Sequence, residues 1–252
     1  MKTADSLQNN LALYQPCHKL SFSDPLRWLK KGWQDFQRAP WHSLSYGAIF
    51  TGAAWMLIYF SWSYEHYLLL GLLFSFLLVG PMLAFGLYDI SQQLERKHKP
   101  TFSHERRKAF HEMGHELMLA LLLGTVFLIM FIMTSLAMNI GSAFGPSAVL
   151  TVVPLSNTVS LLITAVFAVL FFCAGTFALP MILDQDANAM TAMLTSLNAV
   201  WHNKAVLSLW VLLILALTVV GFATALAGFV LIVPVLGYAT WHAYRETIIT
   251  NK

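Results

Sequence analysis

A long apolar stretch near the C-terminus, from Val206 to Arg245, limits the folds open to this chain more than any other feature. It contains no Asp, Glu, Lys, Arg or His before His242. A helix that crosses a bilayer needs about 20 mainly apolar residues, so the stretch is long enough for two crossings. The small residues of 223–228 offer a place to turn. We therefore expect two membrane helices here, with one crossing followed by a re-entrant segment as the alternative.

The composition excludes an ordinary soluble domain. Of the 252 residues, 58% are hydrophobic and 11% are charged, whereas soluble domains carry about a quarter charged residues. The net charge of +3 does not indicate nucleic-acid binding, because the basic residues are distributed as membrane topology requires. Cys17 and Cys173 lie far apart in the sequence and give neither metal-ligand spacing nor a disulfide framework.

Apolar runs along the whole chain predict six membrane crossings. Their approximate ranges are 43–62, 66–88, 117–138, 157–182, 206–224 and 227–244. If both termini lie on one side of the membrane, every Lys and Arg of the sequence falls on that side. Short cytoplasmic loops are enriched in Lys and Arg. We therefore expect a multi-pass membrane protein with both termini in the cytoplasm.

An amphipathic segment precedes each predicted pair of crossings. The first begins at Ser23-Asp24-Pro25, where a capping side chain and a first-turn proline predict a helix start. Its apolar residues at helical spacing are Leu26, Leu29, Trp33 and Phe36. The clearest segment, before the fifth crossing, has Met190, Met193, Leu194, Leu197, Val200 and Trp201. We expect these helices to lie in the membrane interface or to pack beneath the bundle.

The order of amphipathic helix, two crossings and a proline exit occurs three times. The repeats cover about 23–90, 101–185 and 186–248 and follow a polar N-terminal tail, residues 1–22. The predicted fold class is therefore all-α: one integral membrane domain over 23–248, with six transmembrane helices in three hairpins. The exit prolines are Pro81, Pro180 and Pro234. Each removes a helical hydrogen bond, so the helix bends or another group satisfies the freed carbonyl.

Charged and aromatic residues follow these exits. Asp89 and Asp184 come after the first two prolines, and Arg245 holds the matching place in the third repeat. Trp241 and His242 precede Arg245 in the last helix. We interpret these residues as a structural anchor at the cytoplasmic interface, in which the arginine pairs with the aspartates. The alternative is that the charges simply mark the boundary with water.

The sharpest catalytic pattern is His111-Glu112-Met113-Gly114-His115, an H-E-x-x-H sequence. On a helix, His111 and His115 share a face and suit a zinc ion, and Glu112 is placed to activate a metal-bound water. The segment resembles intramembrane zinc proteases, although the residues 106–108 before it are basic where those proteases have an apolar run. The alternative interpretation is a solvated basic face of an interfacial helix.

Other cofactor chemistry has little support in the sequence. Haem–copper enzymes need several histidines inside membrane helices. The nine histidines of this chain lie in tails, connecting segments or the ends of crossings. We therefore expect no haem, copper or other cofactor. Ion-coupled transporters place carboxylates within their crossings, and none of the predicted crossings has one near its centre.

Three stretches carry a resemblance to a known family: 80–88, then 179–184 together with 192–203, then 234–245. They resemble a bacterial family of predicted integral membrane proteins of unknown function, the domain of unknown function 2189. Some members are labelled putative cytochrome c oxidase subunits. The resemblance implies a membrane fold and at most an accessory role in an oxidase, and it supplies no catalytic residues.

The expected function is therefore a non-catalytic one. The leading hypothesis is an accessory or scaffold subunit of a membrane protein complex, associated with a respiratory terminal oxidase and in contact with the lipid bilayer. The second hypothesis is a carrier for lipid or a small apolar solute. The third is an intramembrane zinc metalloprotease that acts through the H-E-x-x-H segment.

Overall fold

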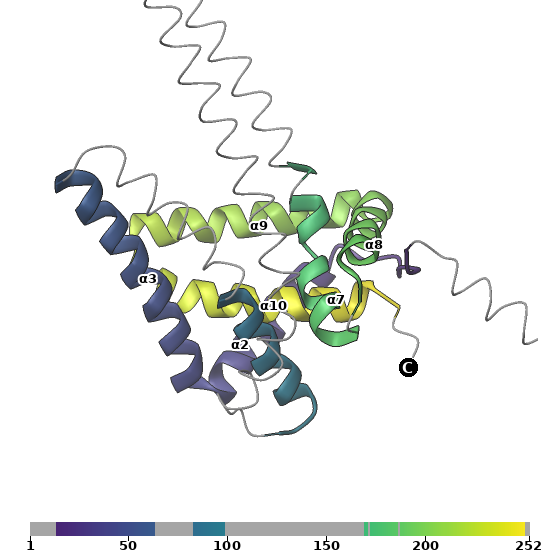
Figure 1. The fold of residues 1–252 in the computed structure, drawn as a ribbon, viewed down its shortest axis with the longest axis horizontal. Coiled ribbons are helices and arrows are strands. Elements are labelled where there is room, and N and C mark those ends of the chain that lie inside the picture. Colours follow the sequence, from purple (N-terminus) through teal and green to yellow (C-terminus); the bar gives the residue numbers. More distant parts are fainter. Residues whose placement is uncertain (1–13, 64–82, 99–168, 171, 186, 250–252) are drawn as a thin grey trace, which may run out of the picture.

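The computed structural model describes residues 14–63, 83–98, 169–170, 172–185 and 187–249. The helices within them are α2 (Asp24–Arg38), α3 (Pro40–Ser63), α7 (Ala178–Gln185), α8 (Ala189–His202), α9 (Lys204–Ala223) and α10 (Phe229–Thr247), with residues 83–95 and 172–175 also helical. The extended backbone in this part of the chain is a single antiparallel bridge between Cys17 and Ile248. The described residues thus confirm the all-α prediction (Figure 1).

The third predicted crossing, most of the second and half of the fourth lie outside the described residues. The same holds for four of the candidate site residues: Pro81, His111, Glu112 and His115. The six crossings and the threefold repeat therefore remain predictions.

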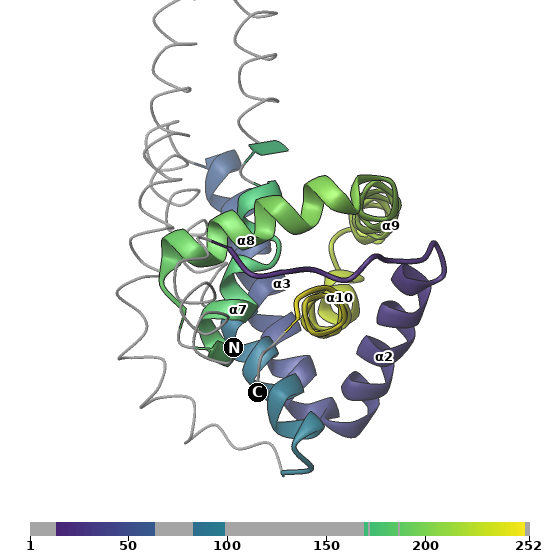
Figure 2. The same ribbon diagram turned by 90° about the vertical axis from the view of Figure 1, so that its right-hand side faces the viewer.

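Helix α10 is the centre of the described fold. It packs chiefly against α2 and α3, with further contacts to α7 and α9, and the view along its axis shows these helices around it (Figure 2). Its aromatic residues Tyr238, Trp241 and Tyr244 are fully buried. An edge-to-face contact between Trp28 and Trp210, with centroids 5.6 Å apart, joins α2 to α9. Large aromatic side chains thus fill the core around one central helix.

Glycines bring the backbones of the neighbouring helices close to α10. A methyl group at Gly32 of α2 would lie 2.5 Å from the carbonyl oxygen of Val235. A methyl group at Gly47 of α3 would overlap the backbone of Val230. Gly52, one and a half turns further along α3, has open space around it. The first two glycines are therefore required by helix packing, which is a common arrangement in membrane bundles.

Helix α9 is long and apolar enough to cross a bilayer. Its 20 residues have a mean hydropathy of 2.7 in their most apolar window, and it is the one helix of the described residues that meets this criterion. Its outer side leaves large apolar side chains exposed, among them Leu212, Leu215, Val219 and Phe222. Such a surface suits lipid rather than water. The fifth predicted crossing, 206–224, coincides with this helix.

Helices α9 and α10 form an antiparallel hairpin, as both views show (Figures 1 and 2). The turn between them contains two non-glycine residues with positive φ, Ala225 at 50° and Leu226 at 71°. Thr224 stabilises the turn, because its Oγ1 accepts a hydrogen bond of 2.9 Å from the Gly228 amide. The stretch Val206–Arg245 therefore folds as two helices of similar length, which supports the hairpin interpretation of its sequence.

Helices α2 and α8 lie across the direction of α9 and α10 (Figure 2). Helix α2 begins at the predicted place, with Pro25 in its first turn, but the Ser23 side chain makes no capping bond. Asp24 instead accepts a hydrogen bond of 2.8 Å from the Ser21 amide. In α8 the capping residue is Asn188, whose side chain accepts from the Met190 amide. The first and third predicted amphipathic segments are thus helices, with local capping that the sequence did not reveal, and the second lies outside the described residues.

Residues 14–22 of the predicted N-terminal tail run along the ends of α8 and α10. The His18 amide donates to the Thr247 carbonyl at 2.8 Å. Asn203 holds the same segment with its side-chain amide, since Oδ1 accepts from the Leu20 amide at 2.9 Å and Nδ2 donates to the His18 carbonyl at 3.0 Å. The chain segment before α2 is therefore tied to the junction of α8 and α9.

Candidate functional site

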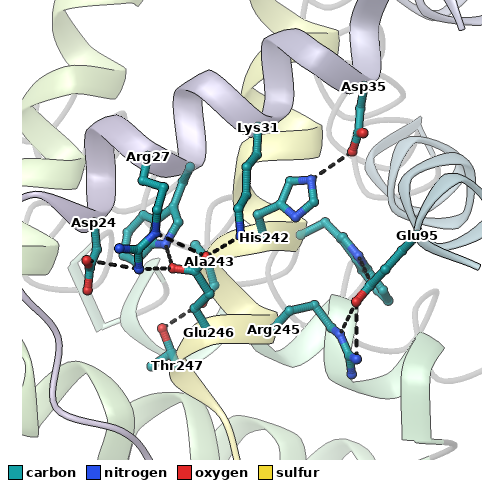
Figure 3. A network of polar contacts seen from close by, with 12 residues as sticks. Asp24, Arg27, Lys31, Asp35, Glu95, His242, Ala243, Arg245, Glu246 and Thr247 are labelled. Atoms are coloured by element: carbon teal, nitrogen blue, oxygen red, sulfur yellow. Dashed lines mark hydrogen bonds and ion pairs between the residues drawn. The ribbon is translucent and has the colours of Figure 1, made fainter. Parts of the chain in front are cut away.

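The charged residues of the described fold gather at the C-terminal end of α10 (Figure 3). His242, Arg245 and Glu246 occupy successive directions around this helix, because residues three and four apart point to adjacent faces. His242 and Glu246 point towards α2, and Arg245 points towards Glu95. We refer to these residues and their partners as the α10 cluster.

Glu246 is held by three donors from α2. Arg27 Nη2 and Lys31 Nζ each lie 2.6 Å from a carboxylate oxygen, and Trp28 Nε1 donates at 2.8 Å. Partial burial acts to raise the pKa of the Glu246 carboxyl, but the hydrogen bonds from the three donors outweigh it and lower the pKa to about 2. Glu246 is therefore ionised at neutral pH and joins the first turns of α2 to the end of α10.

Arg245 connects two carboxylates from different parts of the chain. Its Nη1 lies 2.8 Å from Asp184 Oδ2 at the end of α7, and its Nε and Nη2 both lie 3.3 Å from Glu95 Oε1. The Asp184 side chain is only 2% exposed and also accepts from Tyr244 Oη and Gln92 Nε2, each at 3.1 Å. Burial acts to lower the pKa of the Arg245 guanidinium, and the two carboxylates raise it above its ordinary value.

Asp35 is the fourth carboxylate acceptor of the cluster and is buried. Its Oδ2 accepts from Ser91 Oγ at 2.7 Å and lies 2.8 Å from His242 Nε2. The exposed Arg38 approaches the other oxygen at 3.6 Å. The Asp35 contacts therefore connect α2, the helix of residues 83–95 and α10 at one point.

The carboxylates of the described residues are all engaged within the fold. Their partners include Arg27 and Ser21 for Asp24, His242 and Ser91 for Asp35, Gln93 for Asp89, Arg245 and Trp241 for Glu95, Arg245 and Tyr244 for Asp184, and Arg27 and Lys31 for Glu246. Within the described ranges, no group of three His, Cys, Asp or Glu side chains is arranged as metal ligands. The contacts of the α10 cluster join α10 to α2, to α7 and to the helix of residues 83–95.

The structure brings several predicted anchor residues together. Asp184, His242 and Arg245 all belong to the α10 cluster, and the predicted pairing of the arginine is found with Asp184. Asp89 is buried and accepts from Gln93 of its own helix at 2.6 Å. Trp241 is fully buried and donates Nε1 to Glu95 at 3.2 Å. It therefore contributes to the packing of the bundle rather than to its surface.

The two described exit prolines differ in their effect. Pro234 lies inside the continuous helix α10, and the carbonyl of Val230, which loses its helical hydrogen bond to the proline, faces Gly47 of α3. Pro180 is the third residue of α7, after a turn at 176–177 that interrupts the helix of 172–175. The predicted continuous crossing over 157–182 is therefore broken near its end, because a proline is tolerated in the first turn of a new helix.

Sequence reasoning missed Asp35 and Glu246, whose carboxylates make side-chain hydrogen bonds between α2 and α10. Their partners are more than 200 residues away along the chain, and no local pattern indicates such a distant pairing. A signal was present in α2 itself. Asp24, Trp28 and Asp35 recur on one face of this basic helix, and carboxylates on the same side as a tryptophan indicate a buried polar contact.

Comparison with known proteins gives one family. The model of the family described as "Predicted integral membrane protein (DUF2189)" matches residues 68–184. Comparisons with curated proteins and with solved structures gave no match. The matched range includes the second predicted exit, Pro180 and Asp184, whose carboxylate lies in the α10 cluster. Residues 68–184 of the chain are therefore similar to the DUF2189 family of predicted integral membrane proteins.

Proposed function

We propose that this chain is a non-catalytic, multi-pass protein of the bacterial inner membrane that acts as an accessory or scaffold subunit of a membrane protein complex. The observation that carries the proposal is the α10 cluster. Its carboxylates accept hydrogen bonds from donors of the same fold, so they serve to fix helix positions. Buried ion pairs specify geometry more than they add stability.

The orientation follows from the distribution of charge. The α10 cluster, the start of α2 and the junction of α8 with α9 all lie at one end of the α9–α10 hairpin (Figure 1). The Lys and Arg residues of the sequence group on one side in the six-crossing topology, and this side is cytoplasmic by the positive-inside rule. We place the α10 cluster and both termini in the cytoplasm.

The proposed scaffold has surfaces for partners outside the cluster. The outer sides of α3 and α9 leave large apolar side chains exposed, including Trp55, Met56, Leu212 and Phe222. Membrane helices of a second protein pack on such surfaces by shape and van der Waals contact. The first complex to examine is a respiratory terminal oxidase, because some members of the family that the sequence resembles are labelled putative cytochrome c oxidase subunits.

The test is purification of the tagged full chain in a mild detergent, with mass spectrometry of what remains bound. We expect the subunits of one membrane complex in fixed ratio, with the oxidase as the first candidate. Chemical crosslinking in intact membranes before solubilisation gives an independent measure. A chain that remains alone after both procedures contradicts the scaffold proposal.

A matched variant separates a scaffold from the protease hypothesis. Glu112→Gln removes the base that an H-E-x-x-H zinc site needs and conserves side-chain size. We expect this variant to recover the same partners as the parent. Loss of a proteolytic cleavage product in this variant supports the protease instead.

A further inference from the structure

Helix α2 carries large apolar side chains on the side that faces away from the bundle. Its inward side packs Trp28, Gly32 and Asp35 against α10. Leu26 is 60% exposed and Trp33 is 44% exposed, and at 3.6 residues per turn these two lie on one face, opposite the packed side. The outward face therefore combines these two large apolar side chains with the exposed Gln37, and its apolar part is better suited to a partner other than water.

A third side of α2 is polar. Arg27, Gln34 and Arg38 are exposed and lie together beside the apolar face. The helix thus meets the protein on one side, water on a second and an apolar environment on the third. A helix at the boundary between headgroups and acyl chains has this division of faces.

The direction of α2 agrees with such a position. In the view along α9 and α10, α2 is seen from its side and lies across both helices (Figure 2). Helix α9 is the described helix that is apolar enough to cross a bilayer. A helix that lies across a membrane-crossing helix, near its polar end, runs along the membrane surface.

Charge distinguishes this face from an ordinary apolar patch. Lys30 is exposed and lies one turn after Leu26, at the edge of the outward face next to the polar side, whereas the next residue, Lys31, is bound to Glu246 at 2.6 Å. The described carboxylates are held inside the fold, so the outward face presents a cation and no competing acid. Tryptophan is also enriched at membrane–water interfaces.

We propose that the outward face of α2, formed by Leu26, Lys30 and Trp33, binds the anionic headgroup layer of the adjacent membrane leaflet. The apolar side chains reach the acyl boundary, and Lys30 binds the phosphate of an anionic lipid. This inference requires no protein partner, so it stands or fails separately from the scaffold function.

Depth measurements test the apolar part of the proposal. The full chain, with Cys17→Ser and Cys173→Ala, receives a spin label at Leu26→Cys or, as the matched control on the polar side, at Gln34→Cys. In nanodiscs of phosphatidylglycerol and phosphatidylcholine, we expect the first label to be accessible to oxygen and protected from a water-soluble nickel complex, and the second to show the reverse. Equal access of the nickel complex to both labels overturns the proposal. Protection of the Leu26 label from both oxygen and nickel also overturns it, because that result indicates that a protein covers this face.

A charge substitution tests the lipid class. Native mass spectrometry of the detergent-solubilised chain with added phosphatidylglycerol or phosphatidylcholine measures lipid preference. We expect the parent to prefer phosphatidylglycerol and Lys30→Gln to lose about fivefold in apparent affinity for it. Arg38→Gln removes the same charge from the polar side and should keep the preference. A parent without preference, or equal losses in both variants, overturns the assignment of Lys30.

Discussion

The replacement of Arg245 by methionine is the most informative perturbation of the α10 cluster. Methionine keeps an apolar side chain of similar length and removes the guanidinium that lies 2.8 Å from Asp184. The Asp184 side chain is 2% exposed, so its carboxylate would remain buried without its nearest cation. We expect the free energy of unfolding to fall by about 3–5 kcal/mol, the usual cost of breaking a buried ion pair from one side.

A second arginine near the same carboxylate provides the control. Arg96 Nη2 lies 4.0 Å from Asp184 Oδ1 with a side chain that is 49% exposed, whereas the Arg245 side chain is 22% exposed. Exposed ion pairs contribute about 0–1 kcal/mol. Arg96→Met should therefore change the stability by less than about 1 kcal/mol.

Thermal unfolding of the purified chain in detergent, followed by tryptophan fluorescence, measures both variants. For a chain of this size, about 2–4 °C of Tm corresponds to 1 kcal/mol. The predicted loss for Arg245→Met is thus about 6–20 °C, and that for Arg96→Met is under about 4 °C. The double variant with Asp184→Asn should recover part of the loss, because the unpaired charge is removed. Equal small shifts in both arginine variants would refute the structural role of the cluster.

Other predictions follow from separate contacts. Gly47→Ala should lower the Tm and weaken helix packing, whereas Gly52→Ala in the same helix should leave the Tm within about 2 °C, because only the first methyl group meets a neighbouring backbone. The pKa of Glu246 is lowered to about 2. The Tm of the parent should therefore exceed that of Glu246→Gln by a constant amount above pH 5, and this difference should shrink as the pH falls from about 4.5 towards 2. A difference that persists unchanged to pH 2 contradicts this prediction. Asn203→Ala should release the segment that it holds and speed tryptic cleavage after Lys19, and an unchanged cleavage rate argues against that restraint.

Some of the fold was predictable because its signals are local. The uninterrupted apolar stretch Val206–Arg245 predicted two helices, and α9 and α10 form them. The start of α2 at Asp24-Pro25 follows from the fixed φ of proline in a first turn. Arg245 and the aspartates follow the exit prolines of their repeats at equivalent positions. The pairing of Arg245 with an aspartate was therefore predictable.

The orientation of the amphipathic helices was harder to predict. The apolar stripe of α8 includes Met190 and Trp201, yet these residues are exposed, and Ala192, Ser196 and Ala199 are buried instead. In a soluble protein the apolar stripe faces the core. Beside a lipid phase, small residues allow helices to approach and large apolar residues face outwards. The period of the pattern therefore predicts the helix but not which side packs.

The side-chain contacts between α2 and α10 could not be predicted. His242 and Asp35 approach to 2.8 Å across a separation of 207 residues. No periodicity within either segment specifies this pairing, because it depends on how α2 lies across α10. The turn before Pro180 is a second example, since the sequence allows either a bent helix or a break, and the neighbouring helices decide between them.

The amount of an assembled membrane complex in cells that lack this chain tests the central claim most directly. Quantitative mass spectrometry of isolated membranes, combined with the turnover per assembled complex, separates assembly from catalysis. The scaffold proposal predicts less of one complex, unchanged turnover per remaining complex, and full recovery on expression of the parent or of Glu112→Gln. Unchanged amounts of every membrane complex, or recovery by the parent but not by Glu112→Gln, would contradict it.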